Sequence, residues 1–304
     1  MNVTEEIRKE IAIGERDTRE TKICFLAALV KAAGSLTLKN NKVGLEIESK
    51  SRSTALAAVM LFKELFGVEV EFSYSSAQKL YFASVKPGRA KEIAGILLPD
   101  DALTEPGLGR TFATQEEEAA FARGLFTANG SAYVPDDEGG GYHLEFSFFG
   151  EESAKRFAEI LGEYDIAVSI AERGEYYGVY CKSGSAMSDI LAFMGAYDGV
   201  LRLNELIVRR AALNNINRGV NCSIANMDKA QRAATQLIEA IARLKAEGTY
   251  ELLDPKLKSV CEEREKHPDY TMAQLAEALG ISKSGLNHRI EKILKEDGKD
   301  EGKR

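Results

Sequence analysis

The residues with the most readable chemistry lie near the end of the chain, where residues 281–289 have the sequence ISKSGLNHR. An arginine side chain can pair with guanine, and an asparagine with adenine, in the major groove of DNA. Hydroxyl and lysine side chains at a helix N-terminus meet backbone phosphates. This composition predicts that eight side chains contact double-stranded DNA: Thr271, Ser282, Lys283, Ser284, Asn287, His288, Arg289 and Lys292.

Short helices must present these side chains, and the flanking sequence predicts them. We expect one helix over residues 257–266, a second capped by Thr271 and a third beginning at Ser282, with Gly280 at the turn between the last two. This spacing is typical of a helix-turn-helix and resembles region 4 of sigma factors. The alternative is an αα-hairpin with no role at DNA. The expected core positions are Leu275, Ala276, Leu279, Leu286 and Ile290.

A basic stretch precedes this motif. Residues 202–245 contain eight arginines and lysines but only three acidic residues, in a helical pattern that Gly219 is expected to bend or interrupt. Such a helix can contact DNA phosphates, or it can be merely solvated, and the sequence leaves both interpretations open. The candidates for phosphate contacts are Arg209, Arg210, Arg218 and Lys229.

An internal repeat organises the first two thirds of the chain. Residues 25–35 align with residues 121–131 at a constant offset, matching Phe, Leu, Ala, Gly and Ser. Each copy predicts a helix rich in small residues that ends at a glycine, Gly34 or Gly130. A glycine after the last turn is expected to supply the left-handed conformation that stops a helix.

The elements after each copy also repeat. The sequence predicts the element order αββαββα in both halves, which are connected by residues 99–109. It places hairpin turns at residues 40–41 and 136–141. The elements expected after the first motif helix are a hairpin over 36–48, a helix over 53–66, a hairpin over 68–85 and a helix over 87–96. Those expected after the second are a hairpin over 132–149, a helix over 151–162, a hairpin over 166–181 and a helix over 186–195.

This arrangement resembles the LAGLIDADG homing endonuclease fold, in which two such helices pack together and two sheets form a saddle over DNA. The resemblance implies that an acidic residue just before each motif glycine binds a divalent metal. Here those positions hold Ala33 and Asn129. Metal-assisted cleavage needs hard oxygen ligands, so we expect no catalytic residues, no metal and no cofactor.

Strand alternation predicts which residues line the open face of the two sheets. Apolar residues alternate with glutamates, and the apolar sets are expected to pack beneath the helices. The open face would then carry Glu46, Glu48, Glu69, Glu71 and Glu145. An acidic face repels phosphates, which argues against this part of the chain, residues 1–196, as the main DNA-binding region. A merely solvated face and a protein-binding face are equally consistent with it.

The composition excludes several classes. The chain of 304 residues has a net charge of −7 and no apolar run near the length of a membrane span. Its acidic N-terminus does not resemble a secretion signal. Four widely spaced cysteines predict reduced thiols, and three separate histidines predict no metal site. We expect a cytoplasmic, nucleoid-associated protein.

The combination of these halves, the sequence NRGVNCSIAN at 217–226 and the terminal ISKSGLNHR is similar to the WhiA family. The resemblance implies an α+β domain of two LAGLIDADG-like halves and an all-α helix-turn-helix domain. It also implies a transcription regulator linked to sporulation, cell division and chromosome segregation. The alternatives are an adaptor that binds RNA polymerase, a sigma factor or another protein, and an active homing-type nuclease, which is disfavoured. The expected segments are residues 1–98 and 99–196 for the two LAGLIDADG-like halves, 197–250 for a basic helical linker, 251–296 for the helix-turn-helix DNA-binding domain and 297–304 for a disordered tail.

Overall fold

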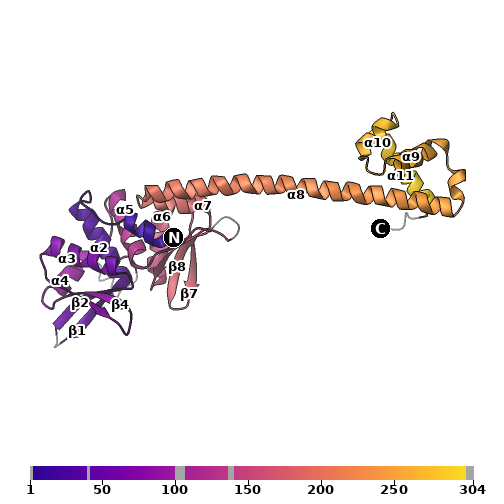
Figure 1. The fold of residues 1–304 in the computed structure, drawn as a ribbon. Helices are drawn as coiled ribbons and strands as arrows, with labels where there is room; N and C mark the ends of the chain where they lie inside the picture. Colours follow the sequence, from indigo (N-terminus) through magenta and orange to yellow (C-terminus); the bar gives the residue numbers. More distant parts are fainter. Residues whose placement is uncertain (1–2, 40–41, 100–106, 136–139, 299–304) are drawn as a thin grey trace. The chain divides into compact units, whose positions relative to one another are not determined.

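The computed structural model describes residues 3–39, 42–99, 107–135 and 140–298 (Figure 1). The turn expected at 40–41 and parts of the turn at 136–141 and of the join at 99–109 lie outside these residues. Contacts divide the chain into two units, residues 1–210 and 211–304. The division falls within helix α8, Tyr197–Ala246, and not at residue 196 or 251. This helix continues through Gly219, so it is not interrupted there.

The first unit consists of two halves, and each has the predicted order αββαββα. The first half contains α2 Arg19–Ala33, β1 Gly34–Lys39, β2 Lys42–Ser49, α3 Arg52–Phe66, β3 Val70–Ser75, β4 Leu80–Val85 and α4 Ala90–Leu97. The second contains α5 Gln115–Asn129, β5 Ser131–Tyr133, β6 His143–Phe148, α6 Glu151–Glu163, β7 Ser169–Arg173, β8 Tyr176–Cys181 and α7 Gly184–Phe193. The predicted α+β class is confirmed.

Each half forms one antiparallel sheet of four strands. The strand orders are β1-β2-β4-β3 and β5-β6-β8-β7, so the two sheets repeat one topology. In the first sheet, Ser35 pairs with Glu46, which pairs with Ser84. In the second, Ser131 pairs with Glu145, which pairs with Tyr180. These registers make Glu46 equivalent to Glu145, and they define which residues of the two open faces correspond.

The two motif helices, α2 and α5, pack against each other at a close crossing. A Cβ atom at Gly124 would lie 2.3 Å from the carbonyl oxygen of Phe25 and 2.6 Å from the Cβ of Ala28. Such distances are far below van der Waals contact. The small residues that the sequence repeats therefore set how near the two helices approach, and Gly124 occupies the tightest point.

The glycines that end these helices differ from the prediction. Gly34 has φ −93° and ψ 149°, and Gly130 has φ −67° and ψ 150°, so both are extended and neither is left-handed. A Cβ at Gly34 would lie 2.3 Å from the Val30 carbonyl oxygen, and one at Gly130 would lie 2.4 Å from the Phe126 ring. The chain turns directly from helix into strand, and only glycine leaves room for that turn.

Helix α1, Val3–Glu10, was not predicted from the sequence. Its Ile7 and the following Ile11 are buried in the core of the first unit. Beyond it, Arg123 on α5 donates to the carbonyl oxygen of Ile11 over 2.9 Å and to Asp17 over 2.7 Å. The N-terminal segment is thus fixed to the second motif helix by both apolar and charged contacts.

The predicted burial of the sheets is confirmed on their helix-covered side. Leu45, Ile47, Leu144, Phe146 and Phe148 are all buried. The predicted acidic open face holds only for the first sheet, where Glu46 is half-buried and Glu48, Glu69 and Glu71 are exposed. Glu145 of the second sheet lies on the open side but is buried, with 8% of its surface exposed, so the prediction that it is exposed there is wrong.

The second unit is all-helical. After α8 it contains η1 Thr249–Leu252, α9 Pro255–Lys266, α10 Met272–Ala278 and α11 Lys283–Glu296. Its core joins the end of α8, through Leu237, Ile241 and Leu244, to the three α-helices after it. Asp297, which the sequence assigned to a disordered tail, caps α11 and forms an ion pair with Arg243 over 2.8 Å. Gly298 is also described, with φ +71°, and the remaining residues of that predicted tail, 299–304, lie outside the described residues.

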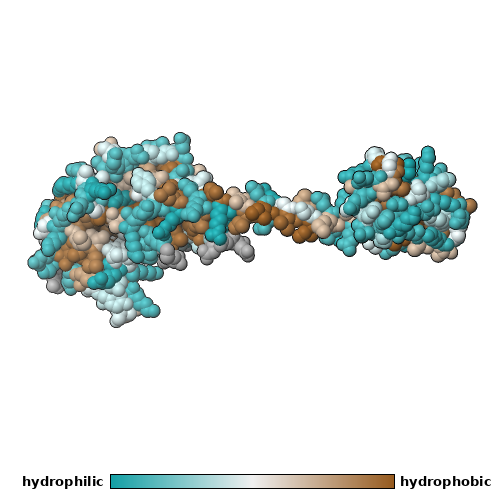
Figure 2. All heavy atoms as spheres, turned by 45° about the horizontal axis from the view of Figure 1, so that its top comes forward, coloured by the Kyte–Doolittle hydropathy of each residue, from teal (hydrophilic) through white to brown (hydrophobic). Residues whose placement is uncertain are grey.

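The part of α8 that precedes this core exposes an apolar stripe. Hydrophobic residues follow one another at intervals of three or four, as on one side of a helix. Figure 2 shows hydrophobic residues along this stretch, and the exposed ones are Leu213, Ile216, Val220, Ile224 and Met227. No helix among the described residues combines the length and apolar composition needed to cross a membrane.

Candidate nucleic-acid interface

The packing of α9, α10 and α11 fixes the predicted reading helix. Leu275 and Ala276 of α10 pack against Leu286 and Ile290 of α11 in one apolar core. Gly280 between them has φ +61°, a left-handed conformation that glycine adopts without strain. The backbone N–H of Ile281 donates to the Ala276 carbonyl oxygen over 3.0 Å, which closes the turn. The three helices thus have the predicted helix-turn-helix arrangement.

Two of the eight predicted contact residues serve as helix caps. Thr271 forms a capping box with Gln274, whose backbone N–H donates to the Thr271 hydroxyl over 3.3 Å. The Ser282 hydroxyl accepts from the backbone N–H of Gly285 over 3.1 Å at the start of α11. Both hydroxyl oxygens satisfy backbone donors that would otherwise lack a partner. Their first role is therefore to start the two helices.

Five of the predicted contact residues share the exposed surface of α11. None of the residues in its first two turns is acidic, so the helix N-terminus faces solvent with a positive field. This face can donate to phosphates and hydrogen-bond to base edges. The exposed residues are Lys283, Ser284, Asn287, His288 and Lys292.

Arg289 lies differently from these five. Its side chain is half-buried, and its Nη1 atom lies 3.5 Å from the carbonyl oxygen of Lys256 in α9. The residue therefore faces the first helix of the domain, and it would have to leave this contact to reach a base edge.

Sequence reasoning missed Arg264, a fully buried arginine in α9. Its Nη1 donates to the carbonyl oxygens of Tyr270 over 2.7 Å and of Pro268 over 3.3 Å. Burial lowers the pKa of this guanidinium from its usual value. Arg264 thereby holds the loop that leads into α10. Nothing in its sequence neighbourhood distinguishes it from the exposed basic residues nearby.

The basic residues predicted on α8 fall into two groups. Arg218 and Lys229 are exposed. Arg210 lies over the ring of Tyr142, with its guanidinium carbon 5.6 Å from the ring centre, and Arg209 also has an interaction partner. Arg209 is exposed as well, so three of the four candidates lie on exposed positions of α8 and only Arg210 is half-buried.

The motif helices end without the carboxylates of a metal site. Ala33 has no ligating atom, and the Asn129 amide donates to the Ser147 carbonyl oxygen over 2.7 Å. Among the described residues, no group of three or more metal-ligating side chains comes together. The NH2 group of Asn129 is thus bonded to the neighbouring sheet, while its Oδ1 is buried without a hydrogen-bond partner among the described residues.

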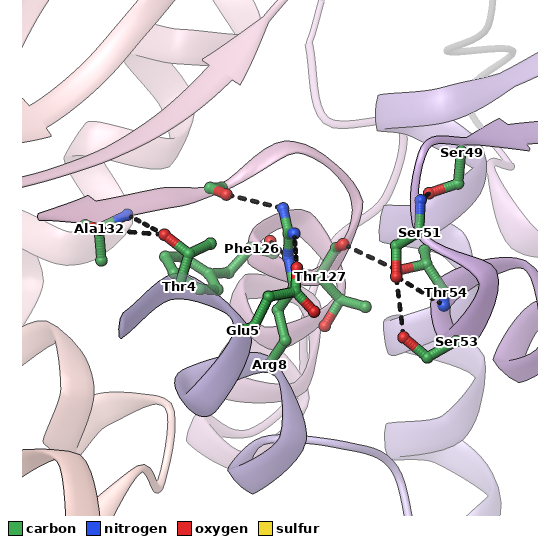
Figure 3. A network of polar contacts seen from close by, with 11 residues as sticks. Thr4, Glu5, Arg8, Ser49, Ser51, Ser53, Thr54, Phe126, Thr127 and Ala132 are labelled. Carbon is green, nitrogen blue, oxygen red and sulfur yellow. Dashed lines mark hydrogen bonds and ion pairs between the residues drawn. The ribbon is translucent and has the colours of Figure 1, made fainter. Parts of the chain in front are cut away.

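The end of α5 is instead clamped by α1 and α3 (Figure 3). Arg8 donates to the Gly130 carbonyl oxygen over 2.9 Å, and Thr4 exchanges two hydrogen bonds with the backbone of Ala132. From the other side, the Thr54 hydroxyl donates to the Thr127 carbonyl oxygen over 3.3 Å. Hydrogen bonds to backbone carbonyls thus stabilise the place where a nuclease would hold its metal.

Comparison with known proteins matches three segments of the chain, which correspond to the two αββαββα halves and the C-terminal helical region. Residues 19–85 match the WhiA N-terminal LAGLIDADG-like domain, residues 118–212 the WhiA LAGLIDADG-like domain, and residues 216–296 the WhiA C-terminal HTH domain. A protein of Thermoanaerobacter pseudethanolicus named "Probable cell division protein WhiA" is 30% identical over 96% of both chains. The chain belongs to the WhiA family.

Other WhiA proteins agree with this assignment. A WhiA of Staphylococcus carnosus, also named a probable cell division protein, is 29% identical and covers 96% of this chain. The crystal structure of full-length DUF199/WhiA from Thermatoga maritima covers 97% of both chains with a TM-score of 0.60 and 23% identity, which shows a shared fold. The predicted family and fold class are confirmed.

Proposed function

We propose that this WhiA protein is a non-catalytic regulator of transcription that binds double-stranded DNA through α11 and acts in cell division. The observation that carries the proposal is the exposed, acid-free first half of α11 on a rigid helix-turn-helix core. The relatives' names support the link to cell division. Sporulation and chromosome segregation remain functions that the family resemblance suggests.

The contacts we propose are of two kinds. Lys283 and Ser284, at the N-terminus of α11, would bind phosphates, while Asn287 and His288 would reach base edges. Arg218 and Lys229 on α8 are the proposed additional phosphate contacts, since both are exposed. Partial neutralisation of the DNA backbone by these cations explains how a chain of net charge −7 can bind a polyanion.

The first prediction concerns Lys283. Duplexes selected by the full chain from a random library provide the probe, and fluorescence anisotropy at several salt concentrations provides the measurement. We expect Lys283→Gln to weaken binding to all selected duplexes alike and to reduce the slope of log affinity against log salt by about one. Asn287→Ala should instead relax sequence preference at one position, with a loss of about 1–3 kcal/mol.

The matched control is Lys91→Gln, which removes an exposed lysine from α4 in the other unit. This variant should bind as the unchanged protein does. Wild-type binding by both Lys283→Gln and Asn287→Ala would remove α11 from the DNA contact and contradict the proposal.

The absence of nuclease activity is also part of the proposal, and it rests on the lack of a carboxylate at both motif positions, which hold Ala33 and Asn129. Supercoiled plasmid incubated with the full chain and Mg²⁺ or Mn²⁺ should stay intact. Cleavage that Asn129→Ala abolishes would reverse this conclusion.

A second candidate function is supported by the exposed glutamates of the first sheet, Glu48, Glu69 and Glu71. We propose that this acidic face binds a protein with a basic surface, for which RNA polymerase and sigma factors are the first candidates to examine. Co-purification with a tagged full chain should recover such a partner, and Glu48→Lys with Glu71→Lys should reduce the recovery. Equal recovery with the doubly reversed chain would rule out this face.

A further inference from the structure

The open faces of the two sheets carry different chemistry, although the sheets belong to one internal repeat. The strand registers match Glu71 of the first sheet with Ser169 of the second, and Glu48 with Ser147. At both positions the second sheet has lost a carboxylate. Among the described strand residues of this face, Glu145 is an acid that remains, and it is buried.

The same registers show what the second sheet has gained. Tyr180 replaces Ser84, Arg173 replaces Ser75, and Tyr176 replaces Leu80. On the outer pair of strands, Tyr133 and His143 replace Thr37 and Gly44. Among the residues compared, the first open face therefore carries more carboxylates, and the second carries more aromatic and basic side chains, although Phe82 of the first corresponds to Gly178 of the second.

Glu145 organises this second face. Its carboxylate lies 3.1 Å from Nε2 of His143 and 3.3 Å from a guanidinium nitrogen of Arg173. The carboxylate also packs against Gly178 of the neighbouring strand β8. A Cβ atom added at Gly178 would lie 2.8 Å from it, so a larger residue would not fit there. One buried acid thus positions a histidine and an arginine on this face.

Tyr180 lies at the centre of these groups. The Arg173 guanidinium carbon is 5.6 Å from its ring centre, the Lys182 ammonium is 5.2 Å away, and the His143 ring centre is 5.7 Å away. Two further rings flank the cluster on the same face. Tyr133 is 55% exposed and Tyr176 is 39% exposed, so both offer ring surface to a ligand.

We propose that the open face of the second sheet, formed by Tyr133, Tyr176, Tyr180, Arg173, Lys182 and His143, binds single-stranded nucleic acid. Aromatic rings on a positively charged surface stack unpaired bases, while the cations bind the connecting phosphates. A duplex keeps its base faces stacked internally, so exposed tyrosines have little to contact there. The proposal does not depend on duplex binding by α11.

The chain contains no tryptophan, so a tryptophan introduced at the proposed site serves as a specific fluorescence probe. In the full-length Tyr180→Trp variant, all tryptophan emission comes from the proposed site. We expect a single-stranded DNA or RNA oligonucleotide of about 12 nucleotides to quench this emission saturably, since a base stacks on the ring. The duplex of the same sequence should quench much less at equal concentration. No quenching, or equal quenching by the duplex, would overturn the proposal.

Anisotropy with the same labelled oligonucleotide tests the site without altering Tyr180. Tyr176→Ala and Arg173→Gln should each weaken single-strand binding by roughly tenfold. Lys182→Gln should weaken it too, whereas Lys86→Gln, at the equivalent position of the first sheet, should not. Unchanged single-strand affinity in the second-sheet variants would overturn the proposal and leave a protein as the partner of this face.

Variants in α11 separate this site from the duplex reader. Lys283→Gln should weaken duplex binding and leave single-strand binding intact, and Arg173→Gln should do the reverse. If Lys283→Gln abolished single-strand binding and Arg173→Gln did not, that binding would belong to α11. This result would contradict the proposal regardless of the effect on duplex binding.

Discussion

At the scale of single residues, one buried and one half-buried arginine stabilise the two units through backbone carbonyls. Arg264 binds the carbonyl oxygens of Pro268 and Tyr270, and Arg8 binds that of Gly130. Carbonyl oxygens in loops and at helix ends have no partner within the helix, so a planar guanidinium can satisfy two of them at once. These arginines act in the fold, whereas the exposed cations of α11 face solvent.

Replacement of Arg264 should destabilise the second unit. Arg264→Met keeps the apolar stem but leaves two carbonyl oxygens without their donor, which we expect to cost about 1–3 kcal/mol in the free energy of unfolding. Chemical denaturation followed by circular dichroism measures this loss. Arg232→Met, at an exposed position on α8, should change stability by less than about 0.5 kcal/mol. Equal effects of the two substitutions would contradict the structural role of Arg264.

The ion pair between Asp17 and Arg123 should make stability depend on pH. Burial raises the pKa of Asp17, but hydrogen bonds from Arg123 and the Gly14 backbone outweigh it, so the pKa falls below its usual 3.8. A lowered pKa stabilises the folded state above the unfolded value, and this stabilisation disappears as the pH falls through the folded value. Relative to Asp17→Asn, the protein should be about 1 kcal/mol more stable at neutral pH.

Urea denaturation of both proteins from neutral pH down to about pH 3 measures that difference. The difference should be constant above about pH 5 and should shrink only at the acidic end of the range. A difference that stays constant down to the lowest pH would show that Asp17 does not carry it.

At the scale of elements, two glycines in helices have opposite roles. A Cβ at Gly124 would collide with α2, whereas no atom lies within 4 Å of a Cβ at Gly219 in α8. We expect Gly219→Ala to stabilise the chain by about 0.5–1 kcal/mol, because alanine is the better helix former. Gly124→Ala should destabilise it by about 1–3 kcal/mol through overpacking. Thermal unfolding of both variants measures these opposite changes in stability. If Gly124→Ala stabilised the chain, α2 and α5 would be able to move apart at little energetic cost.

The local pattern of the sequence was sufficient to predict most of these elements. Helix caps and turns depend on neighbours within a few residues, so Thr271, Gly280 and Ser282 could be assigned their positions correctly. The burial of Glu145 could not be predicted, because it requires Gly178 on a strand that is distant in sequence. The orientation of Arg289 likewise depends on α9, whose Lys256 lies 33 positions earlier in the chain.

At the scale of the whole molecule, each unit has its own apolar core. We expect two calorimetric transitions, because the two cores are separate and each can unfold as its own cooperative unit. Arg264→Met should lower the melting temperature of one transition by several degrees and leave the other unchanged. Differential scanning calorimetry of the full chain measures both. A single transition that shifts as a whole would show that the two cores unfold together.

The close crossing of α2 and α5 has a consequence for assembly. Its two equivalent positions hold different residues, Ala28 on one side and Gly124 on the other, and the alanine methyl group lies where a second one would collide. Two first halves would bring two methyl groups to that point, and two second halves would leave a gap. The crossing therefore fits one alanine-bearing and one glycine-bearing helix, and it disfavours the pairing of two first halves at this distance.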